Sequence, residues 1–149
     1  MSQEWLYEGK PWNPEYEDIP PEYVGFVYRI TDNETGEMYI GQKRLHKTKT
    51  LPITKTRKRR VKTRVESDWR TYHGSSTVIK QQIAEGHAGR YRREILRFGY
   101  SKGDLSYLET LEQFNQGVLL KKEYLNGIIN CRIHKKHLSE KLKEELNDY

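Results

Sequence analysis

Two short segments rich in aromatic and β-branched residues flank a polar stretch, and they constrain the fold more than any other feature of the chain. Residues 25–31 (GFVYRIT) and 37–41 (EMYIG) have the composition of strands. The five residues between them, DNETG, are typical of a turn, in which Gly36 can adopt a positive φ. The pattern predicts an antiparallel β-hairpin, and therefore a protein built around a sheet.

The rest of the chain alternates helix and strand signals. Residues 76–85 and 104–116 carry apolar side chains at helical spacing, residues 90–98 alternate as a strand does, and residues 137–146 resemble a charged terminal helix. We expect an α+β fold in which a central three-stranded antiparallel sheet is flanked by helices. The second of the two long helices has one apolar stripe, made of Tyr107, Leu111, Phe114 and Val118.

Positive charge is concentrated in one segment. Residues 43–64 contain 11 lysines and arginines and no carboxylate, whereas the rest of the chain has 16 basic and 21 acidic residues. Like charges at this density repel each other, and a polyanion relieves the repulsion, so the segment indicates nucleic-acid binding. It lacks apolar periodicity and has Pro52 in its middle, so we expect a long loop inserted after the second strand. A solvated loop or a localisation signal is the alternative.

The first 24 residues form an acidic and aromatic arm that holds four of the five prolines. We expect this arm to be extended, with its aromatic side chains packed on the body of the protein. The expected organisation is therefore an arm over 1–24, a globular domain over 25–133 that includes the basic segment, and a charged helix over 134–149.

Composition argues against two classes of protein. No apolar run approaches the roughly 20 residues that span a bilayer, and 11% aromatic residues is more than a disordered chain carries. Cys131 is the only cysteine, so no internal disulfide can form and no zinc-site spacing exists. Residues 1–10 lack the order of a secretory signal. We expect a cytoplasmic protein that does not enter membranes.

The hairpin carries two half-motifs that point to a family. Phe26-Val27-Tyr28 lies on the first strand and Tyr39-Ile40-Gly41 on the second. This arrangement resembles the GIY-YIG nuclease family, whose second half-motif is matched in full and whose first is degenerate here. The stretches SDWRTYHGSS, LSYLE and YLNG are similar to small phage-encoded members. The resemblance covers residues 25 to about 133, and it implies a GIY-YIG-type fold and a metal-dependent DNA endonuclease, acting in a bacterial host if phage-encoded.

The resemblance also implies roles for particular residues. Members of the family position and activate water in a tyrosine-rich pocket, so Tyr28 would act as general base or water-positioning group and Tyr39 would orient the water or a phosphate oxygen. Because a free tyrosine has a pKa of about 10, such a base needs nearby cations that lower it. Glu109 matches the glutamate that holds a divalent metal, with Glu112 as the alternative.

Three further positions match less directly. Arg70 is the best match to the arginine that contacts the phosphate, with Arg64 and Lys43 as alternatives. His73 would be a proton donor or phosphate contact, or else an ordinary surface histidine. Asn126 resembles a late asparagine that organises the site, and Asn130 is the alternative.

The expected cofactor is a divalent metal, Mg²⁺ in the first place and Mn²⁺ in the second. The expected partner is DNA, and the sequence leaves open whether the chain acts alone or as a homodimer. The residues expected to contact DNA are Gly41, Lys43, Arg44, Arg57, Lys58, Arg59, Arg60, Lys62 and Arg64.

Two functions of other classes stay open. The chain could be a non-catalytic nucleic-acid-binding module whose basic segment grips phosphates and whose hairpin is scaffold. It could also be an interaction protein, in which the acidic arm over 1–24 docks a basic partner or folds back on the basic segment.

Overall fold

The predicted hairpin forms the centre of the protein. A computed structural model describes residues 4–147, and in it strand β3 (Gly25–Asp32) pairs antiparallel with β4 (Met38–Arg44). Gly36 in the connecting turn has φ of +78°, as the turn prediction requires. The hairpin is therefore confirmed, and its strands extend one to three residues beyond the predicted ends.

The sheet is larger than expected. Strand β7 (Tyr91–Gly99) lies antiparallel to β3, as predicted, but two strands from the arm, β1 (Leu6–Tyr7) and β2 (Lys10–Pro11), extend the sheet to five strands in the order β2-β1-β7-β3-β4. The sheet is mixed because β1 runs parallel to β7. The three predicted strands pair antiparallel as expected, but the prediction was wrong in the number of strands and missed the parallel pairing of β1.

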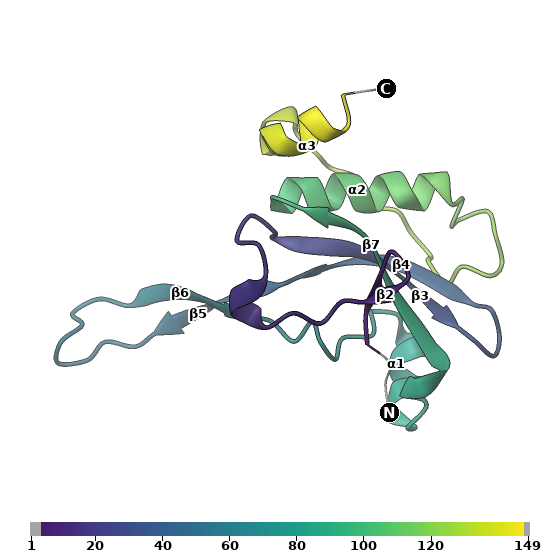
Figure 1. Cartoon of the computed structure of the whole chain (residues 1–149), viewed down its shortest axis with the longest axis horizontal. Coiled ribbons are helices and arrows are strands. Elements are labelled where there is room, and N and C mark those ends of the chain that lie inside the picture. The colour runs from purple at the N-terminus through teal and green to yellow at the C-terminus, as the bar shows by residue number, and fades with distance from the viewer. Residues whose placement is uncertain (1–3, 148–149) are drawn as a thin grey trace.

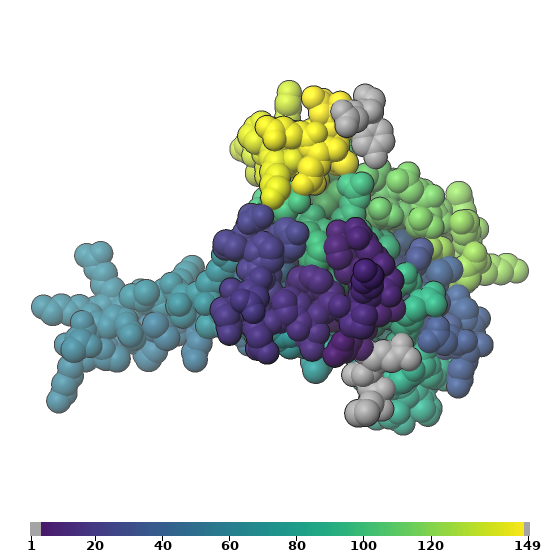
Figure 2. Space-filling model, in the orientation of Figure 1, coloured from purple at the N-terminus to yellow at the C-terminus, as the bar shows by residue number. Residues whose placement is uncertain are grey.

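Aromatic packing explains why the arm joins the sheet. Trp5 is 1% exposed, and its indole N–H donates to the carbonyl of Trp69 at 2.7 Å. Trp12 packs against Trp69 and Phe98. These contacts hold the arm against the free edge of β7, where the backbone groups of β1 find partners. Figure 2 shows the arm (purple) spread over the side of the protein that faces the viewer.

The basic segment is not a long loop. Strands β5 (His46–Leu51) and β6 (Val61–Glu66) form a separate antiparallel hairpin, the β5–β6 hairpin, which projects from the body (Figure 1). Threonine and valine alternate with the charged residues in both strands, and β-branched residues favour the extended backbone. The cations can then point away from the ribbon into solvent, so charge density does not prevent pairing. Only residues 52–60 at the tip are irregular.

Two helices flank the sheet on opposite faces and a third lies beyond one of them (Figure 1). Helix α1 (Thr77–Ala84) and the arm cover one face, over a core that includes Trp5, Phe26, Tyr28 and Ile79. Helix α2 (Lys102–Asn115) covers the other, over a core that includes Val27, Ile40 and Leu108. Short 3₁₀ helices lie at Tyr16–Asp18, Ala88–Arg90 and Lys135–His137.

The apolar stripe of α2 is not its buried face. Tyr107 and Phe114 are 37% and 65% exposed, whereas Leu105, Leu108 and Gln113 are buried. The buried face includes polar residues that bond to backbone carbonyls; Gln113, for instance, donates to the carbonyl of Ile40. Such residues look solvent-facing in a sequence, which is why apolar spacing gave the wrong side.

Helix α3 (Glu140–Glu145) is shorter than the predicted 137–146. Buried Asp104 holds its start: its carboxylate accepts bonds from the backbone N–H and the hydroxyl of Ser139 at 2.8 and 2.6 Å. Residues 1–3 of the expected arm and 148–149 of the expected C-terminal helix lie outside the described residues. No helix within residues 4–147 is long and apolar enough to cross a membrane.

Acid stability should depend on one buried ion pair. Burial alone would raise the pKa of Asp32, but bonds from Arg90 and from the backbone N–H groups of Glu34 and Thr35 hold it at about 2, below the ordinary 3.8. A carboxylate with a lowered pKa stabilises the fold above its unfolded value, and that contribution is lost as pH falls through the folded value. We expect Asp32→Asn to lower the free energy of unfolding at pH 7 by about 2 kcal/mol.

Urea denaturation between pH 7 and pH 2 tests this expectation, since the difference between wild type and variant should shrink below pH 4. Glu34→Gln is the matched control, because Glu34 also pairs with Arg90 but its side chain is 69% exposed. Equal effects of the two substitutions would contradict the assignment.

Candidate active site

Two tyrosines from the central hairpin converge over a glycine. The register of β3 and β4 sets Tyr28 opposite Gly41 and Ile30 opposite Tyr39, so the tyrosines share a face of the sheet. A methyl group built on Gly41 would lie 2.7 Å from Cζ of Tyr28 and 3.1 Å from Cε1 of Tyr39. A glycine is therefore required for both rings to occupy their places.

A segment that precedes α1 closes over the same rings. The Tyr39 hydroxyl lies 2.8 Å from Oγ of Ser75, and Tyr72 meets Tyr28 edge-on. Gly74 has φ of +89°, and a methyl group added to it would lie 3.3 Å from the Tyr28 hydroxyl and 3.6 Å from Cδ1 of Tyr39. Sequence reasoning chose only His73 here and missed Tyr72, Gly74 and Ser75. The available signal was the run YHGSS, in which small residues follow an aromatic pair just before a helix.

The environment of Tyr28 shifts its pKa upward. Burial is the main cause, followed by Tyr72, Tyr39 and the charge of Glu109, and together they raise the pKa well above the ordinary value. A tyrosine that acts as a base needs the opposite shift. The protein's own groups therefore keep the Tyr28 hydroxyl protonated at neutral pH, as a hydrogen-bond donor.

Glu109 lies on α2, which covers the other face of the sheet, and its charge acts on Tyr28. It lies on the sheet-facing side of α2, half-buried, and its carboxylate interacts with the side chain of Gln42, the residue after Gly41. Burial raises the pKa of Glu109, and the bond from Gln42 offsets part of that shift. Among the main groups that raise the pKa of Tyr28, the carboxylate is that of Glu109. Glu112 is not one of these groups.

His73 is oriented by its backbone. It is 8% exposed, and its Nδ1 lies 2.8 Å from the carbonyl of Thr71, so Nδ1–H is the donor. Burial and the nearby Arg93 guanidinium lower the pKa of His73. Its Nε2 has no hydrogen-bond partner within residues 4–147. The imidazole is thus neutral near pH 7 and presents an unused lone pair.

Arg70 is not brought to the tyrosines. Its guanidinium bonds to Glu66 at 2.7 Å, to the Asn13 side chain at 2.5 Å and to the Pro14 carbonyl at 2.6 Å. These contacts hold the arm to the body.

Of its two alternatives, Lys43 lies nearer the pocket. Its Nζ is 4.1 Å from the centre of the Tyr72 ring and 2.5 Å from the Asp68 carboxylate. Arg64 lies out on β6, exposed. Lys43 is therefore the predicted cation that lies beside the tyrosine cluster.

Asn126 fixes the strand that carries the second half-motif. Its side-chain amide accepts from the N–H of Ile40 at 3.0 Å and donates to the carbonyl of Ile40 at 2.8 Å. The side-chain amide of Asn126 thus makes the two hydrogen bonds to Ile40 that a residue of a neighbouring strand would make at the edge of β4. Asn130, its alternative, supplies a backbone carbonyl to Thr110. Asn126 therefore positions the peptide between Tyr39 and Gly41.

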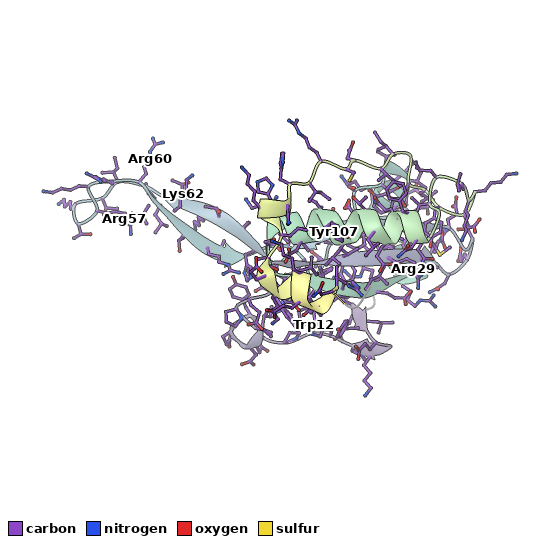
Figure 3. The ribbon with its side chains drawn as sticks, turned by 90° about the horizontal axis from the view of Figure 1, so that it is seen from above. Trp12, Arg29, Arg57, Arg60, Lys62 and Tyr107 are labelled. Carbon is purple, nitrogen blue, oxygen red and sulfur yellow. The ribbon has the colours of Figure 1, made fainter. Side chains whose placement is uncertain are left out.

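The predicted DNA-binding residues fall into two groups. Gly41, Lys43 and Arg44 lie on β4, next to the tyrosines, and the others lie on the β5–β6 hairpin. In Figure 3, Arg57, Arg60 and Lys62 project from the hairpin, far from Arg29 in the central sheet. The hairpin group consists of Arg57, Lys58, Arg59, Arg60, Lys62 and Arg64.

The donors around Glu109 suit a hard cation. No cluster of three or more His, Cys, Asp or Glu side chains that could hold a metal occurs in the described part of the chain. One carboxylate beside the amide of Gln42 nevertheless fits Mg²⁺, which keeps several of its waters and takes one or two carboxylates.

Comparison with known proteins gives one match. A family model described as "Putative endonuclease segE, GIY-YIG domain" matches residues 5–129, which is well over half of the chain. No curated protein and no solved structure matches. The matched range includes the arm from Trp5, which packs into the core beside the tyrosine cluster.

Proposed function

We propose that this member of the GIY-YIG family, which matches the phage-type endonuclease SegE, hydrolyses phosphodiester bonds of DNA in the pocket around Gly41. The observation that carries the proposal is that Tyr28 and Tyr39 meet over Gly41, a residue without a side chain, while the charge of Glu109 acts on Tyr28. A missing side chain lets a phosphodiester backbone approach the hydroxyl groups closely.

The roles follow from the protonation states in the pocket. Tyr28, protonated, donates a hydrogen bond to the attacking water or to a phosphate oxygen, and Tyr39 does the same with Ser75 behind it. The neutral His73 has an unused lone pair on Nε2, which is buried, so it can accept a proton only from a water that enters beside it. Lys43 supplies positive charge for the phosphate in the role that the sequence first gave to Arg70.

Glu109 and Gln42 are the residues that would hold Mg²⁺ or Mn²⁺. A bound divalent ion supplies positive charge to the phosphate and lowers the pKa of a coordinated water. The raised pKa of Glu109 has the consequence that binding of the ion competes with a proton, so the affinity for the ion should rise with pH.

The test is cleavage of supercoiled plasmid. We expect wild type to nick or linearise the plasmid in magnesium and to leave it intact in EDTA. Tyr28→Phe removes only the hydroxyl and should lower the rate by about 100-fold, the loss expected for one misplaced or missing catalytic hydrogen bond. Equal cleavage by both proteins, or by wild type with and without EDTA, would refute the proposal.

A non-catalytic nucleic-acid-binding module is the second candidate, favoured by the exposed cations of the β5–β6 hairpin. It predicts salt-sensitive DNA binding with no strand breaks in magnesium, and binding that is unchanged in Tyr28→Phe. The same plasmid assay, run beside a binding measurement, separates the two functions.

A further inference from the structure

The β5–β6 hairpin has the dimensions of an element that enters a DNA groove. Its two strands pair only with each other, so the ribbon stands clear of the five-stranded sheet (Figures 1 and 2). The major groove of B-DNA is about 12 Å wide and admits a two-stranded β-ribbon. Six paired residues extend about 20 Å, or about six base pairs at about 3.4 Å each. The cations therefore lie on an element that can follow a duplex.

The base of the hairpin is fixed to the body. His46 Nε2–H donates to the Tyr23 carbonyl at 3.0 Å, and the Tyr16 hydroxyl donates to Nδ1 at 2.6 Å. Ser67, just after β6, donates its hydroxyl to the Arg44 carbonyl at 2.6 Å and its N–H to the Leu45 carbonyl. The ribbon therefore leaves the sheet in a set direction relative to the tyrosine pocket.

The two faces of the ribbon differ in chemistry. The register sets Lys62 opposite Thr50 and Arg64 opposite Thr48, so one face combines cations with hydroxyl groups. On the other face Val61 lies opposite Leu51 and Val65 opposite Lys47, with Lys49 opposite Thr63. Each face carries two lysines or arginines, but the first has two threonines and no aliphatic residue, whereas the second has one threonine and three aliphatic residues. Threonine and basic side chains bond both to phosphates and to base edges, and valine and leucine do neither. We call the first the threonine face.

Thr48 and Arg64 of the threonine face line a cavity at the base of the hairpin, together with Lys47 of the other face. The cavity has a volume of about 510 Å³ and is lined by Thr48 and by residues of the body, including Glu22, which pairs with Lys141 at 3.1 Å. Five cations line it: Arg44, Lys47, Arg64, Lys102 and Lys141.

The cavity also connects to the candidate active site. Arg44 lies two residues after Gln42 on β4, so both side chains point to the same side of the strand, and Gln42 contacts Glu109. Arg44, which lines the cavity, thus places a cation on the same side of β4 as Gln42, the partner of Glu109.

We infer that the protein binds duplex DNA, rather than single strands, with the threonine face of the β5–β6 hairpin in a groove on one side of the scissile phosphate and with the cavity cations on the adjoining backbone. The inference rests on the proposed function for the place of the cut. It names the face of the hairpin that is contacted and two body residues, Lys102 and Lys141, that sequence reasoning did not select.

Two lysines in adjacent residue pairs of the ribbon, one on each face, allow a matched test. Lys62 and Lys49 are both exposed and each lies opposite a threonine. Binding to a fluorescent 20-base-pair duplex in EDTA is measured over a range of salt concentrations. We expect Lys62→Gln to weaken binding about fivefold at 150 mM salt and to reduce the slope of log K against log salt by about 0.9. Lys49→Gln should change the affinity by less than twofold.

Two further comparisons complete the test. Lys102→Gln should weaken duplex binding as Lys62→Gln does, whereas Lys10→Gln, on β2 at the opposite edge of the sheet, should not. A single strand of 20 nucleotides should bind at least about tenfold more weakly than the duplex. Equal losses in Lys62→Gln and Lys49→Gln, or a single strand that binds as well as the duplex, would overturn the inference. The measurement requires no cleavage, so its failure and the failure of the proposed function are distinguishable.

Discussion

Replacing Glu109 by glutamine is expected to abolish plasmid cleavage in magnesium, with a rate loss of about 1,000-fold. The substitution keeps the size of the side chain and removes the charge that would hold the divalent ion. Loss of a metal's charge stabilisation costs several kcal/mol in the transition state, and each 1.36 kcal/mol is tenfold in rate. The fold should be kept or slightly stabilised, since the raised pKa of Glu109 means that burial disfavours its charged form.

The matched control is Glu112→Gln, which removes the same charge three residues farther along α2. We expect a rate within about threefold of wild type and an unchanged magnesium dependence. Titration of the cleavage rate with Mg²⁺ or Mn²⁺ separates the two variants, because only Glu109→Gln should shift the metal concentration needed for half-maximal rate. If the losses were reversed, Glu112 would be the metal ligand.

Gly41→Ala is expected to give a folded protein that cuts DNA at least 100 times more slowly. The added methyl group would collide with the Tyr28 ring, which cannot move aside because it is 1% exposed and packed against Trp5, Tyr39 and Tyr72. Overpacking of this kind costs about 1–3 kcal/mol of stability. A shift of about 1 Å in a positioning group is enough to cost about 100-fold in rate.

Gly127→Ala serves as the control, because a methyl group there would meet no atom within 4 Å. It should leave both stability and cleavage unchanged. Thermal melting of Gly41→Ala reports the cost in stability. Binding of the 20-base-pair duplex reports whether the β5–β6 hairpin of the variant still binds DNA. A Gly41→Ala protein that cuts at the wild-type rate would mean that the DNA backbone does not approach the tyrosines over Gly41.

Much of the core could be predicted because local signals agreed with the tertiary structure. The 25–31 and 37–41 segments, the strand near 90–98 and the helix near 76–85 each had a periodicity and a turn or stop residue that matched. Gly86, for example, ends α1 with φ of +87°. The pair Tyr28 and Tyr39 followed from the same hairpin, since register alone brings their side chains together.

Other features depend on contacts between distant residues, which the sequence does not report. The arm became two strands because Trp5 is buried against Trp69, 64 residues away. Arg70 looked like a phosphate contact by position, but Asn13 and Pro14 hold its guanidinium. The basic segment lacks apolar periodicity and contains Pro52, which predicted a loop, yet its strands pair as a ribbon that stands in solvent. In each case the local structure was determined by a partner far away in the sequence or by exposure to solvent.

The amide of Asn126 at the margin of β4 also bears on how copies of the chain associate. Outer strands usually offer unpaired N–H and C=O groups to any passing strand, which is how many sheets merge across subunits and how aggregates begin. Here Ile40 is bonded to Asn126, while Met38 donates to the Glu123 carbonyl and accepts from Leu125. A second molecule therefore finds no vacant ladder at Met38 and Ile40. Two copies could pair through Met38 and Ile40 only by displacing Asn126, Glu123 and Leu125 from the margin of β4.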